Sequence, residues 1–138
     1  MSREIKFRAW DKKENEMMTE FRGKYVVSNI GLLNPVGDKF DLIDGTRFEL
    51  MQYTEIKDVT GKEIYEGDIV EFYNDEYYVL HPGIAKVIFD LGAFQLESKK
   101  YGADYLGNMD IDDMDIRVIG NIYANPELLE KLESEVEQ

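Results

Sequence analysis

Residues 64–72 read Ile64-Tyr65-Glu66-Gly67-Asp68-Ile69-Val70-Glu71-Phe72. Gly67 and Asp68 predict a corner, because glycine adopts the backbone angles that a tight change of direction needs. Apolar and polar residues alternate after the corner, so Val70 and Phe72 share one face of a strand. Small barrels are often built from short strands that begin at such corners. This stretch therefore indicates a β domain.

The same period-two pattern continues on both sides of this segment. Strands are expected at residues 48–54, 77–80, 85–91, from 94 onward and at 116–123, separated by turns such as the one around Gly61. In the strand at 85–91, the residues expected to face one side are Ala85, Val87, Phe89 and Leu91. Residues 98–115 lack a clear period, so we expect them to cross the surface. Their expected anchors are Tyr101, Tyr105, Leu106 or Met109.

The N-terminal part predicts two further strands. Residues 5–10 alternate, which places Ile5, Phe7 and Ala9 toward a core and leaves a basic face that carries Trp10. A weaker strand is expected at residues 17–21 after a polar turn. Residues 23–47 contain many turn-forming residues, so they predict short extended pieces of undefined topology.

One helix is expected, at the C-terminal end of the sequence. Asn125 can cap it, Pro126 suits its first position, and Glu127 complements the positive end of the helix dipole. Four apolar residues then follow at helical spacing. This stripe, which either docks on the barrel or contacts a second copy of the chain, is Leu128, Leu129, Leu132 and Val136.

These elements define the expected fold class. Six or more short strands with one late helix are typical of a mainly β protein, a small open barrel or sandwich. We expect one domain over residues 1–138, with N-terminal strands and loops at 1–56, a barrel core at 57–124 and the helix at 125–138.

Composition excludes several classes of function. The 138 residues carry 16 basic and 29 acidic side chains, a net charge of −13, which opposes direct binding to nucleic acid or anionic lipid. No cysteine is present and His81 is the single histidine, so thiolate chemistry and a histidine-rich metal site are excluded, and we expect no cofactor. No apolar run approaches the length of a membrane span. We therefore expect a soluble cytoplasmic protein.

One weak catalytic pattern is present. Asp90 precedes Glu97-Ser98-Lys99 at a spacing that resembles the degenerate signature of restriction-endonuclease-like nucleases. Two carboxylates could hold a magnesium ion, with Lys99 beside the attacking water or the phosphate. The absence of helices around the predicted sheet and the negative charge both weigh against this alternative.

A second acidic pattern is Asp110-Ile111-Asp112-Asp113-Met114-Asp115. Asp110, Asp112 and Asp115 are a candidate calcium site, since alternating carboxylates can converge on a hard cation. The glycine and glutamate of an EF-hand loop are missing at the corresponding positions. A solvated acidic loop is the favoured interpretation.

Several blocks of the sequence together resemble the YopX-like family of phage and prophage proteins. They are Glu4-Ile5-Lys6-Phe7-Arg8-Ala9-Trp10-Asp11, Leu50-Met51-Gln52-Tyr53-Thr54, Lys57-Asp58, Gly61 through Val70, Val118-Ile119-Gly120-Asn121-Ile122-Tyr123 and Asn125-Pro126-Glu127-Leu128-Leu129. The resemblance implies a mostly β domain with an SH3-like barrel. It implies no activity and carries over no catalytic residues. Glu55 departs from the pattern, because such proteins more commonly place glycine there.

The expected function follows from the missing catalytic signature and from the resemblance. We expect a non-enzymatic phage or prophage accessory protein that binds another protein in the bacterial cytoplasm. The acidic surface could also imitate DNA and occupy a basic nucleic-acid-binding protein. The alternatives are the magnesium-dependent nuclease and a self-associating assembly protein.

Overall fold

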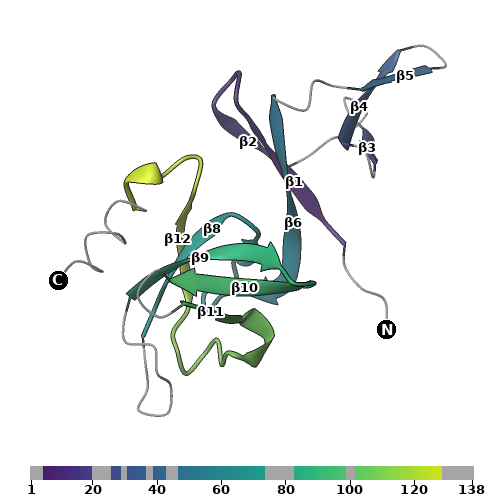
Figure 1. The fold of residues 1–138 in the computed structure, drawn as a ribbon. Helices are drawn as coiled ribbons and strands as arrows, with labels where there is room; N and C mark the ends of the chain where they lie inside the picture. Colours follow the sequence, from purple (N-terminus) through teal and green to yellow (C-terminus); the bar gives the residue numbers. More distant parts are fainter. Residues whose placement is uncertain are drawn as a thin grey trace. The chain divides into compact units, whose positions relative to one another are not determined.

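The computed structural model describes residues 5–19, 26–28, 31–36, 39–42, 47–73, 83–98 and 102–128. Its backbone contacts divide the chain into two compact units, which we describe separately. The N-terminal unit is Ile5–Gln52, and the C-terminal unit includes Tyr53–Gln138. The described elements are almost all β-strands, so the prediction of a mainly β protein is confirmed (Figure 1).

The N-terminal unit contains two groups of antiparallel strands. In the first, β1 (Phe7–Asp11) lies between β2 (Glu16–Met18) and the first half of β6 (Phe48–Lys57). In the second, β4 (Gly31–Val36) lies between β3 (Val26–Ser28) and β5 (Lys39–Leu42). The strands predicted at 5–10 and 48–54 are confirmed. The segment without a predicted topology contains this three-stranded sheet.

The two faces of β1 differ from the expected pattern. Ala9 is completely buried as predicted, but Ile5 is 59% exposed. Arg8, on the face expected to be basic, is buried, with its Nη2 atom 3.7 Å from the Met51 sulfur. The reason is that β6 covers this part of β1 with an apolar side chain, and the long stem of an arginine packs well against such a surface.

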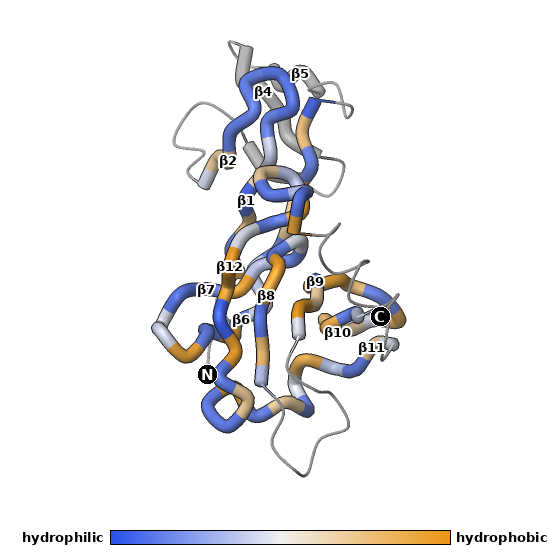
Figure 2. The backbone as a smooth tube through the Cα atoms, turned by 90° about the vertical axis from the view of Figure 1, so that its left-hand side faces the viewer, coloured by the Kyte–Doolittle hydropathy of each residue, from blue (hydrophilic) through white to orange (hydrophobic). Residues whose placement is uncertain are grey.

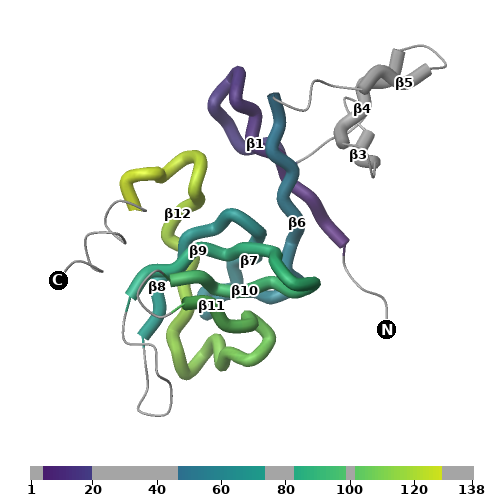
Figure 3. The backbone as a smooth tube through the Cα atoms, in the orientation of Figure 1, coloured from purple at the N-terminus to yellow at the C-terminus, as the bar shows by residue number. Residues whose placement is uncertain are grey.

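The C-terminal unit is a curled, half-barrel sheet (Figures 1 and 3). Its antiparallel strands follow the order β11-β10-β9-β8-β12, while β7 pairs with the end of β6. The bounds are β7 (Glu63–Tyr65), β8 (Asp68–Phe72), β9 (Gly83–Asp90), β10 (Ala93–Ser98), β11 (Gly102–Tyr105), a 3-10 helix η1 (Leu106–Asn108) and β12 (Arg117–Asn121). The strand predicted at 77–80 lies outside the described residues.

The core of this unit gathers the apolar faces of the sheet, and Figure 2 shows hydrophobic stretches along β9 and β12. The described residues of the segment 98–115 contribute more than the expected surface crossing. They form β11 and η1, and they bury Leu106 and Met114 completely. Of the expected anchors, Leu106 is confirmed, Met109 packs partly buried on the core and Tyr105 is exposed. Tyr101 lies outside the described residues.

The corner at Gly67 and Asp68 has the predicted form. Gly67 has a φ of 86°, and the buried Asp68 closes the corner by accepting the backbone N–H of Tyr65 at 2.7 Å. A related strain occurs in β6, where Glu55 has a φ of 69° at an irregularity in the pairing with β7. This left-handed conformation favours glycine, so a glutamate is strained at this position.

Asp58 ties the following turn to the last strand. One carboxylate oxygen accepts hydrogen bonds from the Thr60 hydroxyl at 2.6 Å and from the backbone N–H groups of Thr60 at 2.9 Å and Lys62 at 3.0 Å. The other oxygen accepts the N–H of Val118 at 2.9 Å. Burial by itself raises the pKa of this carboxyl, but these hydrogen bonds outweigh it and lower the pKa below 3.8.

The end of β12 is closed by two asparagines. Asn121 accepts the backbone N–H groups of Tyr123 and Ala124, and the Asn125 side chain accepts the N–H of Asn121 at 3.1 Å. Asn125 therefore bonds backward to the strand, and the expectation that its side chain caps the following helix is wrong. Residues 126–128 are helical, and the rest of the predicted helix lies outside the described residues.

Gly120 lies directly against the Asn125 side chain, so we expect Gly120→Ala to destabilise the C-terminal unit. An added Cβ would lie 2.5 Å from the Asn125 Oδ1 atom, so the Asn125 side chain would have to move. The expected loss in the free energy of unfolding is about 1–3 kcal/mol, the usual cost of overpacking. Urea unfolding followed by far-UV circular dichroism measures it. Gly107→Ala is the matched control, because an added Cβ there meets no atom within 4 Å. Equal midpoints for the two variants would contradict this account.

Candidate functional site

The most unusual local structure is the tip of the hairpin formed by β9 and β10. Asp90 pairs with Ala93, so only Leu91 and Gly92 connect the strands. Their φ angles are 52° and 78°, as in the two-residue turns that fit the twist of a hairpin. Asparagine followed by glycine is the usual pair in such turns. Leucine at the first position is exceptional, because its Cβ makes the left-handed conformation costly.

The side chains at this tip are apolar and face solvent. Leu91 is 83% exposed and Phe89 is 51% exposed. Phe94, opposite Phe89 in the ladder, packs edge-on against it with ring centroids 5.1 Å apart. The stripe expected to face one side of the sheet therefore splits: Ala85 and Val87 enter the core, while its last two members extend beyond the core. We name Phe89, Leu91 and Phe94 the apolar tip.

The nuclease hypothesis places Asp90 and Glu97 on the same hairpin, and the register separates them. Asp90 is opposite Ala93, whereas Glu97 is opposite Lys86 and forms an ion pair with it at 3.3 Å. Four residues along a strand correspond to roughly 13 Å between the two backbone positions. The structure therefore does not bring the two carboxylates together. Lys99 lies outside the described residues.

Two of the three carboxylates of the predicted calcium site have local partners. Asp110 accepts the backbone N–H of Asp113 at 3.0 Å, and Asp115 forms an ion pair with Arg117 at 3.1 Å. Asp112 is exposed, and its backbone carbonyl accepts the N–H of Asp115. In the part of the chain that the structure describes, no three Asp, Glu or His side chains are grouped so that they could hold a metal ion.

The apolar stripe of the C-terminal helix is described only at its start. Leu128 packs with Ile119 and Ile122 against the buried Ile69 and Ile84. This residue therefore docks on the sheet, which is one of the two arrangements expected for the stripe. Leu129, Leu132 and Val136 lie outside the described residues, and a contact of these three with a second copy stays a prediction.

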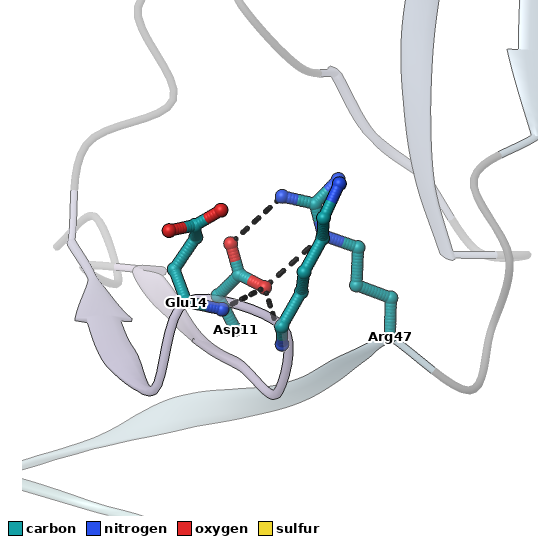
Figure 4. Close-up of polar contacts among 4 residues, drawn as sticks. Asp11, Glu14 and Arg47 are labelled. Atoms are coloured by element: carbon teal, nitrogen blue, oxygen red, sulfur yellow. Dashed lines mark hydrogen bonds and ion pairs between the residues drawn. The ribbon is translucent and has the colours of Figure 1, made fainter.

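The N-terminal unit contains a polar cluster that the sequence did not reveal. Arg47 donates two hydrogen bonds to Asp11, from Nε at 3.0 Å and from Nη2 at 2.9 Å (Figure 4). Its guanidinium also lies 4.8 Å from the centroid of the Phe48 ring. Asp11 also accepts the backbone N–H groups of Lys13 and Glu14. Asp11 and Arg47 are 36 positions apart in the sequence. The available signal for their pairing was that Asp11 follows the strand predicted at 5–10 and Arg47 precedes the strand predicted at 48–54.

This cluster fixes a turn and leaves no reactive group. The hydrogen bond from Arg47 is the main cause that lowers the pKa of Asp11 below its ordinary value of 3.8; burial opposes this shift and the backbone N–H groups reinforce it. An ionised carboxylate that accepts two hydrogen bonds from an arginine is a poor proton acceptor at neutral pH. We therefore assign the pair a structural role.

We expect Arg47→Ala to destabilise the N-terminal unit by about 1–3 kcal/mol, because it leaves the buried Asp11 carboxylate without its charged donor. Fluorescence of Trp10, the one tryptophan of the chain, reports unfolding of this unit. Lys12→Ala is the matched control, since its ion pair with Glu49 is exposed and should contribute little. The pKa of Asp11 is lowered by folding, so the stabilisation is present above pH 4 and is lost as the pH falls below that value. A difference between wild type and Arg47→Ala that does not shrink in acid would contradict this role.

The nuclease hypothesis has a direct test. Because the hairpin register separates Asp90 from Glu97, we expect the purified chain with magnesium to leave single-stranded, duplex and branched DNA intact. Gel electrophoresis of labelled DNA measures cleavage. Metal-dependent cleavage that disappears in both Asp90→Ala and Glu97→Ala would establish the nuclease instead.

Comparison with known proteins gives a consistent result. A curated relative, the SPbeta prophage-derived uncharacterized protein YopX of Bacillus subtilis (strain 168), is 38% identical over 76 residues, which are 52% of this chain and 54% of the relative. This match thus spans about half the length of the relative. No helix in the described ranges has the length and apolar character needed to cross a membrane.

Two crystal structures resemble the fold. Protein EF1440 from Enterococcus faecalis is 29% identical, with a TM-score of 0.59 over 93% of this chain and 99% of that chain. Protein yopX from Bacillus subtilis is 27% identical, with a TM-score of 0.59 over 88% of this chain and 95% of that chain. The model of the family described as YopX protein matches residues 6–130. The chain therefore belongs to the YopX protein family.

Proposed function

We propose that this prophage-type protein is a non-enzymatic module that binds another protein through its apolar tip. The observation that carries the proposal is Leu91, which is unfavourable on two independent grounds. Its φ of 52° costs about 1–2 kcal/mol for a residue with a branched side chain. Its side chain is 83% exposed, so folding gains almost no burial from it.

Leu91 lowers local stability in two ways, so we infer that it contacts a partner molecule instead of stabilising its own chain. Strained positions concentrate where proteins bind or react, and no reactive group lies in the turn. Binding would remove the apolar surface from water and so offset the cost of exposing it. The neighbouring aromatic pair adds to this surface and gives it rigidity, because Phe94 is packed on the core.

The hairpin supplies a stable platform for such a contact. β9 is paired on both sides, with β8 and β10, so the strands that lead to the tip are held along their length. Binding sites on fixed strands keep their geometry better than sites on unpaired loops. These features support an anchor that is formed before the partner arrives, which lowers the cost of association.

The acidic surface supports a related but broader proposal. Exposed carboxylates follow one another at Asp104, Asp110, Asp112 and Asp113, and the net charge of the chain is −13. A surface of this kind could imitate DNA, in which case the complex would weaken steeply with salt and would compete with DNA. We also propose that the barrel is SH3-like. We propose further that the protein acts in the cytoplasm of a bacterial host.

The substitution Leu91→Asn separates stability from binding. Asparagine tolerates the left-handed conformation, so we expect unfolding to require about 0.5–1 kcal/mol more than in wild type. The same change removes the anchor, and we expect retention of the partner from a host lysate on immobilised protein to fall about 30-fold, the effect of losing a strong contact residue. Urea unfolding and quantitative pull-down measure the two effects.

Tyr73→Ser provides the matched control for this experiment. Tyr73 is another exposed apolar residue of the same unit, at 48%, and it lies outside the hairpin tip. We expect the control to retain the partner. Equal retention by wild type, Leu91→Asn and Tyr73→Ser would show that the apolar tip is not the binding surface.

A further inference from the structure

We propose that the partner receives the apolar tip in an apolar pocket bordered by basic side chains. This inference rests on the proposed function and adds the chemistry of the partner surface. It follows from two properties of the tip, its small area and the charge placed between its apolar residues. Both can be read from the described residues of the hairpin.

The small area indicates a pocket rather than a flat interface. A large apolar side chain buries about 150–250 Å² when it is covered completely, and the three members of the tip are already partly covered by their own chain. Together they offer roughly 300 Å², well below the roughly 800 Å² per partner of a standard interface. A projecting anchor of this size contributes most when a concave site surrounds it and excludes water.

The charge at the tip comes from Asp90, which lies between Phe89 and Leu91. Its Oδ1 atom accepts the N–H of Leu91 at 2.9 Å, and it forms no ion pair with any described residue. The other acidic residue of the hairpin, Glu97, is matched by Lys86 at 3.3 Å. Asp90 is thus the carboxylate of this hairpin whose charge is left for a partner. A lysine or arginine at the rim of the pocket would complement it.

The charge of the whole chain acts in the same direction. A net charge of −13 attracts a cationic surface over long range and raises the rate of encounter. It also disfavours a second copy as the occupant, because two copies in contact through their tips would oppose one Asp90 to the other. The limited area reinforces this conclusion, since a symmetric contact of two tips falls short of what a stable dimer needs. The occupant is therefore a different, basic protein.

Photo-crosslinking of the full-length chain in bacterial host cells tests the inference. A benzophenone amino acid replaces Leu91 in one version and Tyr73 in the control version, and mass spectrometry identifies the crosslinked peptide. We expect an adduct from position 91 and none from position 73. We expect the modified peptide to line an apolar pocket with lysine or arginine at its edge.

Substitutions at Asp90 then separate the charge from the turn. Asp90→Asn keeps the Oδ1 acceptor for the Leu91 N–H and removes only the charge, while Asp90→Lys reverses the charge. We expect the adduct to decrease in Asp90→Asn and to fall more than about tenfold in Asp90→Lys, because like charges across an interface repel. Raising the salt concentration in a lysate should lower the yield of wild type more than that of Asp90→Asn.

The outcomes distinguish the two proposals. If the yield of an adduct specific to position 91 changes neither in the two Asp90 variants nor with salt, the basic pocket is overturned and the binding function is kept. An adduct with a second copy of the chain would also overturn the basic pocket. Equal or absent adducts from positions 91 and 73 would overturn the proposed function itself.

Discussion

The C-terminal unit depends on one buried carboxylate, that of Asp58. An ion away from water is stable only if hydrogen bonds replace its hydration, and here four donors do so. Three of them close a local turn, and the fourth belongs to Val118, sixty positions later in the sequence. One side chain thus sets the conformation of the turn and holds β12 in place. Gly67-Asp68 and Gly120-Asn121 also shape the backbone, at the corner before β8 and at the end of β12.

The fold could be predicted where local chemistry determines it. The corner at Gly67 and Asp68 follows from the freedom of glycine and from a short acidic side chain that closes the turn. The face of β1 that enters the core could not be predicted in the same way, because the burial of Arg8 depends on Met51 in a strand 43 positions away. Asn125 illustrates a different limit: its side-chain oxygen can cap a helix or bond back to a strand, and in the structure it accepts the N–H of Asn121 beside Gly120.

The candidate site shows what the period-two pattern of the sequence can predict and what it cannot. Alternation predicts that Ala85, Val87, Phe89 and Leu91 face one side of the strand, but it contains no information on where the core ends, and only Ala85 and Val87 are buried. Leu91-Gly92 between two alternating runs was the available signal for a hairpin tip. The spacing of Asp90 and Glu97 misled for a related reason, since the turn length sets the register and the register moves the two carboxylates apart.

The openness of the hairpin tip has a consequence for how proteins of this architecture can diverge. An added Cβ at Gly92 meets no atom within 4 Å, and Leu91 is almost entirely in solvent. Under the proposed binding role, changes at Leu91 alter the surface that a partner meets without disturbing the packed interior, whereas the φ of 78° at Gly92 disfavours any other residue there. A prophage lineage could therefore retarget such a scaffold by exchanging the exposed residues Phe89 and Leu91, while Phe94 and the core beneath it stay the same.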